Sequence, residues 1–315
     1  MTMEQAPKNL QFGTPAMLLS DRVSSDASTM PQQETETAAK PGFMTRLREE
    51  INPSHSDLPV LATCFVSGIC DSVAFNASSV FVSMQTGNTI FLALGTANLP
   101  YAAETLWLRA LVSIVCFWAG CFFFSQSRRI QPKGKMTLAG SFFIQSAFII
   151  TAAAVAQSGA VPAFGMRSLG TALAHERLAS YETEAMTLLP VALLAFQFGG
   201  QIVTSRVLGF NEVPTNVLTS LTNVYLDCDL FSDPLIIAPI GKNVKRNRRV
   251  VAVLLMVAGG IIGAWLQKSK AGMPAALWIG GAVKMVIAVS WLFWKGKKVA
   301  KIQAFRQEQL SFLLL

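Results

Sequence analysis

Apolar residues gather along the chain in blocks that are separated by short polar or charged stretches. A block of roughly 20 apolar residues crosses about 30 Å of hydrocarbon as an α-helix. Two weaker blocks, at residues 81–99 and 213–231, carry more polar residues. The pattern predicts an all-α, polytopic transmembrane helix bundle with about six full spans and two broken or re-entrant segments. The full spans are predicted at residues 58–78, 104–126, 136–157, 187–207, 249–267 and 274–294.

The chain also resembles itself at a nearly fixed offset. The sequence LPVLATCFVSG at 58–68 matches LPVALLAFQFG at 189–199 in Leu, Pro, Val, Phe and Gly. At a slightly larger offset, the aligned residues are Arg109, Gly120, Arg128 and Gly140 with Arg249, Gly260, Lys268 and Gly280. These matches indicate two repeats, about 58–157 and 187–295, with three full spans each. Because three is an odd number, the second repeat would enter the membrane upside down, and such inverted repeats are typical of secondary transporters.

The basic residues decide between arrangements of these spans. They form three clusters, at 128–135, 242–249 and 295–301. If the two weak blocks do not cross and both termini are cytoplasmic, all three clusters are cytoplasmic, as the positive-inside rule requires. The loop 158–186, which has charges of both signs, then lies outside. An arrangement of seven crossings with the N-terminus outside satisfies the same charges and stays open.

The composition is that of a membrane protein: 52% of the residues are hydrophobic and 14% are charged, against about 25% charged in soluble domains. The net charge of +8 does not indicate a nucleic-acid partner, because the basic residues lie beside apolar blocks. The lipid bilayer is the expected partner. Residues 1–50, rich in Ser, Thr, Gln, Glu and Pro, are expected to form a disordered cytoplasmic tail. A transmembrane domain at 55–300 and a cytoplasmic tail at 301–315 would follow.

Side chains that carry catalysis or bind metals are sparse. The chain has five cysteines and two histidines, without a CxxC pair or an HExxH motif, so neither a disulfide framework nor a metal site is indicated. Both histidines lie outside the spans, and no nucleophile–base arrangement or phosphate-binding loop occurs. The expectation is a protein that is not an enzyme, with no catalytic residue, no cofactor and no metal.

Two charges lie inside predicted spans, Asp71 in the first and Lys284 in the last. A charged side chain at the bilayer centre costs about 2.5–3.5 kcal/mol on insertion scales, so each should face the protein interior or a water-filled cavity. Both are candidates for binding a substrate or relaying an ion. The structural alternative is that they pair with each other across two helices.

A polar cluster interrupts the first weak block, and Thr215 and Asn216 hold the corresponding place in the second repeat. The residues of the cluster are Gln85, Thr86, Gly87 and Asn88. Polar backbone and amides at membrane depth must be buried in protein or line a cavity. We therefore expect paired broken helices that meet near the midplane with Asp71, and we expect Gly87 to supply backbone freedom. An ordinary loop between two full spans is the alternative.

The segment GICDSVAF…VFVSMQTGNTIFLALG resembles the opening signature of the YoaK-like family of multi-pass membrane proteins of bacteria and fungi, a family of unknown function. Its pattern is approximately Gly-x-x-Asp-Ala followed by Met-x-Thr-Gly-Asn. The matching residues are Gly68, Asp71, Met84, Thr86, Gly87 and Asn88, with Ser72 where alanine is usual, and Thr215, Val217, Leu218 and Thr219 in the second half. The resemblance covers about residues 55–300. It implies a polytopic integral membrane protein and names no substrate.

The inverted repeats, the broken segments and the buried charges favour a small-molecule or ion transporter with a polar site at the midplane. The plasma membrane, with both termini cytoplasmic, is the expected location. The alternative is a non-transporting membrane scaffold or partner-binding subunit, whose polar residues only hold helices together.

Overall fold

The computed structural model describes residues 47, 49–99, 105–165, 185–210, 213 and 244–297. Within these ranges, six helices are long and apolar enough to cross a membrane. They are α2 (Asp57–Ser78), α4 (Leu106–Ser125), α5 (Lys135–Gln157), α7 (Leu188–Leu208), α9 (Val244–Lys268) and α10 (Gly272–Phe293). The shortest has 20 residues and the longest 25, which at 1.5 Å per residue is about 30–38 Å. The chain is therefore a polytopic helix bundle of an integral membrane protein.

The predicted spans agree with these helices to within a few residues, and α9 shows the largest difference because it begins at Val244. Short 3₁₀ segments follow α4 (Gln126–Arg129), follow α5 (Pro162–Phe164) and precede α7 (Ala185–Thr187). The described residues contain no named strand, only isolated bridges. Most of both predicted tails, most of the loop 158–186 and all of the second weak block except Val213 lie outside the described residues.

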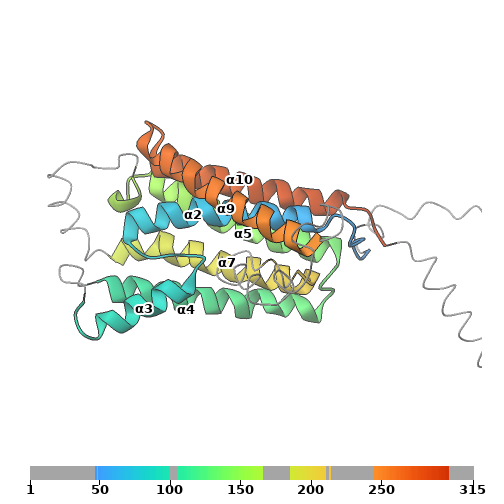
Figure 1. Cartoon of the computed structure of the whole chain (residues 1–315), viewed down its shortest axis with the longest axis horizontal. Coiled ribbons are helices and arrows are strands. Elements are labelled where there is room, and N and C mark those ends of the chain that lie inside the picture. The colour runs from blue at the N-terminus through green and yellow to red at the C-terminus, as the bar shows by residue number, and fades with distance from the viewer. Residues whose placement is uncertain are drawn as a thin grey trace, which may run out of the picture. The chain divides into compact units, whose positions relative to one another are not determined.

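The first weak block turns back instead of crossing. After α2 the chain takes a left-handed conformation at Ser79 (φ 58°) and becomes non-helical until α3 (Gln85–Gly95) begins. The short helix α3 has 11 residues, about 16 Å at 1.5 Å per residue, so it is too short to span. It lies alongside α4 (Figure 1) and runs antiparallel to it, with Gly95 against Trp107 at the start of α4. The predicted re-entrant segment is confirmed here.

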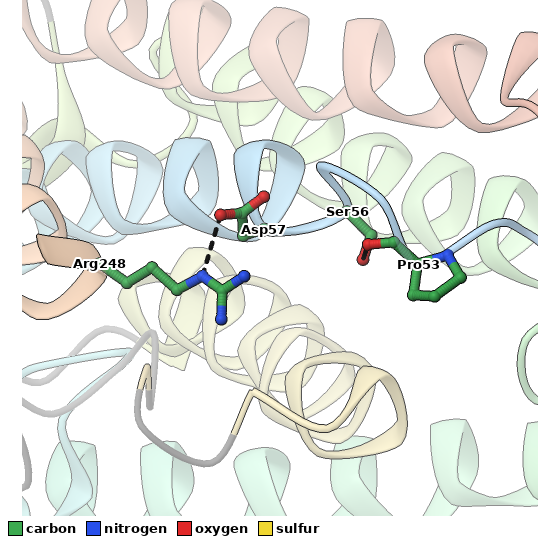
Figure 2. A network of polar contacts seen from close by, with 4 residues as sticks. All are labelled: Pro53, Ser56, Asp57 and Arg248. Carbon is green, nitrogen blue, oxygen red and sulfur yellow. Dashed lines mark hydrogen bonds and ion pairs between the residues drawn. The ribbon is translucent and has the colours of Figure 1, made fainter. Parts of the chain in front are cut away.

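One end of the bundle, which we call the basic end, gathers the described residues of the predicted basic clusters. The N-terminal segment lies between two loops, since the Ile51 N–H donates to the Lys133 carbonyl oxygen (3.0 Å) and the Asn52 N–H to that of Lys295 (2.8 Å). A Lys135–Glu49 ion pair (2.9 Å) joins the same segments. The start of α9 is at this end too, because Arg248 Nε lies 2.9 Å from an Asp57 carboxylate oxygen (Figure 2).

Contacts between the long helices place them in one packing order. Strong contacts join α4 to α7, α7 to α5, α5 to α10, α10 to α2 and α2 to α9, and α9 also touches α10. Helix α2 also touches α7, and these two are the most buried of the six. The other helices expose large apolar side chains, as expected for surfaces in contact with lipid. Examples are Trp118 and Phe122 on α4, Leu254 and Trp265 on α9, and Val286 and Phe293 on α10.

Glycines allow the closest of these contacts. A Cβ at Gly68 of α2 would collide with the Met256 carbonyl oxygen of α9, and one at Gly259 with the Phe65 carbonyl oxygen of α2. Between α4 and α7, a Cβ at Gly120 would collide with the Phe196 carbonyl oxygen. Small residues at helix interfaces let backbones approach, which strengthens packing where lipid offers no hydrophobic driving force.

Candidate functional site

Asp71 lies on the inner face of α2, where its side chain is buried. Its Oδ1 accepts the backbone N–H groups of Val82 (2.9 Å) and Ser83 (2.8 Å), and its Oδ2 accepts the Ser83 hydroxyl. These donors belong to the non-helical segment that turns back between α2 and α3. Asp71 therefore holds that segment at the depth of its own helix turn, and supplies acceptors that lipid cannot.

Asn88 serves the same segment from the other side. Its Oδ1 accepts the Phe81 N–H (3.0 Å), and its Nδ2 donates to the Phe81 carbonyl oxygen (2.6 Å). Gln85 Oε1 accepts a further bond from Asn88 Nδ2 (2.8 Å). Ser113 of α4 closes the cluster, because its hydroxyl donates to the Phe81 carbonyl oxygen (2.8 Å). The broken backbone is thus satisfied by side chains of α2, α3 and α4.

A second polar cluster lies near the middle of the bundle, around Lys284 of α10. Lys284 is 0% exposed. Its Nζ donates to Gln145 Oε1 of α5 (2.8 Å) and to Gln197 Oε1 of α7. The same ammonium lies 5.0 Å from the centroid of the Phe198 ring, within the range of a cation–π contact.

The partners of Lys284 are neutral. Among the described residues, no carboxylate forms an ion pair with it. Asp71 and Lys284 in particular do not pair, so the structural alternative of a direct Asp71–Lys284 ion pair is wrong. Isolated charges are costly to bury without a counter-charge, and here amide dipoles and a ring quadrupole provide the compensation.

Polar contacts continue from this cluster toward the basic end. Gln201, one turn after Gln197 on α7, donates from Nε2 to the Ser67 hydroxyl of α2 (2.8 Å) and the Thr63 carbonyl oxygen (3.3 Å). On the other side of Lys284, the Ser146 hydroxyl of α5 donates to the Gly281 carbonyl oxygen (2.7 Å). Side chains from α2, α5, α7 and α10 therefore meet in one polar layer.

Comparison with known proteins decides the family. Residues 60–290 match the family described as "Protein of unknown function (DUF1275)". The chain belongs to the DUF1275 family. No curated protein and no solved structure matches the chain. The match covers all six long helices of the DUF1275 chain in whole or in large part, including both polar clusters.

In this DUF1275 protein, six of the eight predicted site residues fall into three groups. Asp71, Gln85 and Asn88 come together around the turn between α2 and α3. Lys284 lies apart from them, in the mid-bundle layer. Thr215 and Asn216 lie outside the described residues, so their expected approach to the first cluster stays a prediction.

The other two residues of the predicted polar cluster have different surroundings. Thr86 is exposed and Gly87 is only partly buried. Gly87 lies inside helix α3, and it is not among the described glycines with positive φ. The expectation that Gly87 supplies backbone freedom is therefore wrong. Its missing side chain instead leaves room for the Phe81 ring, which would lie 3.1 Å from an added Cβ.

The sequence did not reveal the partners that define both clusters. Ser83, Ser113 and Gln145 were not predicted as site residues, although all three are polar residues at the edges or inside of apolar blocks. Gln197 and Gln201 share one helix face, four residues apart. That spacing shows which helix face is polar, but it does not reveal that a lysine of another helix lies opposite.

Proposed function

We propose that this protein is a small-molecule or ion transporter whose site is the mid-bundle layer of Lys284, Gln145 and Gln197. The observation that carries the proposal is a fully buried lysine whose neutral partners come from two other helices, one in each half of the sequence. Intramembrane ionisable residues are rare and typically mark substrate or ion pathways. The depth also fits, since transporters hold substrate near the midplane, between repeats.

The packing order of the helices supports the inverted-repeat part of the proposal. The sequence matches α2 to α7 and α4 to α9, which leaves α5 opposite α10. Along their contacts, the helices follow the order α4–α7–α5–α10–α2–α9. If each helix in this order is replaced by its matched helix, the result is the same order read backwards. A two-fold relation between inverted halves would produce this result.

Equivalent glycines support the same relation in detail. The matched pair Gly68 and Gly199 occupies equivalent contacts, because Gly68 meets Gly260 of α9 and Gly199 meets Gly120 of α4. Gly120 and Gly260 are themselves a matched pair in the sequence. The carbonyl oxygens of Phe65 and Phe196, also matched, each face a glycine of the partner helix.

The remaining finer points belong to the same proposal. Gathering the basic clusters at one end is consistent with the positive-inside rule and favours a cytoplasmic basic end, with both termini on that side. The plasma membrane is the proposed location. Within the DUF1275 family, we retain the YoaK-like resemblance as a proposal on the residues that carry it. We also propose that the protein is not an enzyme, because its sequence lacks a nucleophile–base arrangement.

A non-transporting scaffold or partner-binding subunit is the second candidate, and the Asp71 cluster favours it. Within the part of the chain that the structure describes, that carboxylate forms its hydrogen bonds with the protein's own Val82 and Ser83. A protein whose polar residues were all of this kind would need no substrate. Lys284 is the residue that separates the two candidates.

Flux through reconstituted vesicles tests the proposal. Purified protein is incorporated into liposomes, and a panel of labelled anions, cations and neutral solutes is measured for uptake and efflux, with and without a proton gradient. We expect protein-dependent flux of at least one solute, loss of that flux in Lys284→Met, and retention in Gly260→Ala. A Cβ at Gly260 meets only one atom within 4 Å, the Gly68 carbonyl oxygen at 3.9 Å. No flux of any solute above protein-free vesicles would favour the scaffold.

A further inference from the structure

The mid-bundle layer around Lys284 holds a buried amine that has no counter-charge among the described residues. As an ammonium, Lys284 Nζ has three N–H donors, two of which go to the oxygens of Gln145 and Gln197. Phe198 offers its ring to the same group. These partners stabilise an ammonium by dipoles and a quadrupole, and none of them carries charge. A negative charge in this layer would supply the missing partner of the ammonium.

Gln197 adds an independent observation that points to the same kind of ligand. Its side chain is 0% exposed. While its oxygen accepts from Lys284, its Nε2 has no hydrogen-bond partner among the described residues. Leaving such a buried donor unsatisfied is costly. One acceptor group near Lys284 and Gln197 would serve both the ammonium and this amide.

One helix turn before Lys284, α10 has a glycine, Gly280. A long side chain on a helix leans toward the turn before its own Cα, so the Lys284 stem leans toward Gly280. A Cβ added at Gly280 would meet Cys70 Sγ at 3.5 Å, a Val66 methyl at 3.6 Å and an Ile149 methyl at 3.8 Å. These are ordinary contact distances, so an alanine at this position is accepted without displacing its neighbours.

We propose that the Lys284 layer binds a small monovalent anion of about the size of chloride or formate. The inference deepens the proposed function and rests on it, because it makes the substrate or coupling ion of the transporter anionic. The anion accepts hydrogen bonds from Lys284 Nζ and Gln197 Nε2. A cation would be repelled by the ammonium, and a neutral solute would leave the charge uncompensated.

Binding is tested on the detergent-purified full chain through the fluorescence of its six tryptophans during thermal unfolding. Sodium gluconate at constant ionic strength is replaced stepwise by sodium chloride or sodium formate, over about 1 to 100 mM, the range of weak binding. Gluconate is a carboxylate with a six-carbon chain, and it is much larger than chloride or formate. We expect a saturable rise in Tm with chloride, formate or both. The more effective of the two identifies the ligand as halide or carboxylate.

Two variants and one control make the test specific. Lys284→Met should abolish the anion-dependent rise in Tm. Gly280→Ala adds a methyl group one helix turn from Lys284, on the side toward which the lysine stem leans, and should raise the half-saturating anion concentration about tenfold, which corresponds to about 1.4 kcal/mol. Gly260→Ala, on α9, should titrate like the wild type. Because a Cβ fits at Gly280, this variant is expected to fold even if Lys284→Met does not.

Several results would overturn the inference. These are no response to either small anion, or an equal response in folded Lys284→Met or Gly280→Ala. An equal rise in Tm on adding gluconate, or on replacing sodium by choline, would also overturn it, because the response would then not come from the small anion. The outcome is separable from that of the flux assay. Anion binding without flux of any solute would refute the transporter and leave the anion site standing. Flux of a cation or neutral solute without anion binding would do the reverse.

Discussion

Asp71 and Lys284 are both buried, ionisable side chains within apolar helices, yet they are compensated in different ways. Asp71 takes two backbone N–H groups and a hydroxyl from the segment that follows its own helix. Lys284 takes neutral amide oxygens from helices that are remote along the chain. The first arrangement fixes the path of the backbone. The second leaves a buried amine in the middle of the bundle without a counter-charge among the described residues.

The difference shows that a charge in a membrane span is not by itself a functional site. Backbone N–H groups exposed by a broken helix must find acceptors inside the protein, and a carboxylate supplies several acceptors at one point. Asp71 is thus needed because the chain turns back after α2, whether or not anything is transported. No break in the backbone of α10 requires Lys284, so its charge must be accounted for by something other than chain geometry.

The largest expected effect is on stability, at Asp71. Asp71→Leu leaves the N–H groups of Val82 and Ser83 buried without acceptors, at about 1–3 kcal/mol each, so the free energy of unfolding should fall by about 2–6 kcal/mol. Asp71→Asn keeps an acceptor oxygen and should lose less. Folded yield on size-exclusion chromatography and Tm measure both. Lys284→Met removes the charge and its desolvation cost together, so it should be less destabilising than Asp71→Leu. A larger loss of stability in Lys284→Met would contradict the comparison of the two sites.

The next effect concerns Asn88, which binds both polar groups of the Phe81 backbone. Asn88→Ala leaves the partly buried Phe81 N–H unsatisfied and weakens the carbonyl contact, so a loss of about 1 kcal/mol is expected, at the lower end of the range for an unsatisfied group. Thr86→Ala is the matched control, because Thr86 belongs to the same Thr-Gly-Asn motif but is exposed. Unfolding curves of both variants test this. Equal losses in the two would mean that the motif does not act through the backbone bonds of Asn88.

These contrasts also show how much of the fold and of the candidate site could be predicted from the sequence. The length of an apolar block is set by the thickness of the hydrocarbon layer, so the spans were predictable. The polar residues in the first weak block indicated the re-entrant segment that contains α3. The role of Asp71 was not predictable, because its partners become neighbours only after the chain turns back. Gln145 and Gln197 are far from Lys284 in sequence, and nothing in one span shows which residue of another lies opposite.

A smaller effect separates the two glycines of α3. A Cβ at Gly95 would collide with the Trp107 side chain, whereas one at Gly87 meets only the edge of the Phe81 ring at 3.1 Å. Gly95→Ala should therefore cost about 1–3 kcal/mol, the usual range for overpacking. In Gly87→Ala, the higher helix propensity of alanine, worth up to about 1 kcal/mol, should offset most of the contact. Thermal unfolding of both variants measures the difference, and a larger loss at Gly87 would contradict it.

The smallest expected effect is the coupling between the two charges, and it tests the comparison most directly. Asp71 and Lys284 share no hydrogen-bond partner in the part of the chain that the structure describes. Changes at sites without shared partners usually add within about 0.5 kcal/mol. In a double-mutant cycle of Asp71→Asn and Lys284→Met, the two effects on the free energy of unfolding should therefore add. If Lys284→Met instead restored the stability lost in Asp71→Asn, the charges would be acting as a pair. The neutral surroundings of Lys284 could then no longer support an anion site.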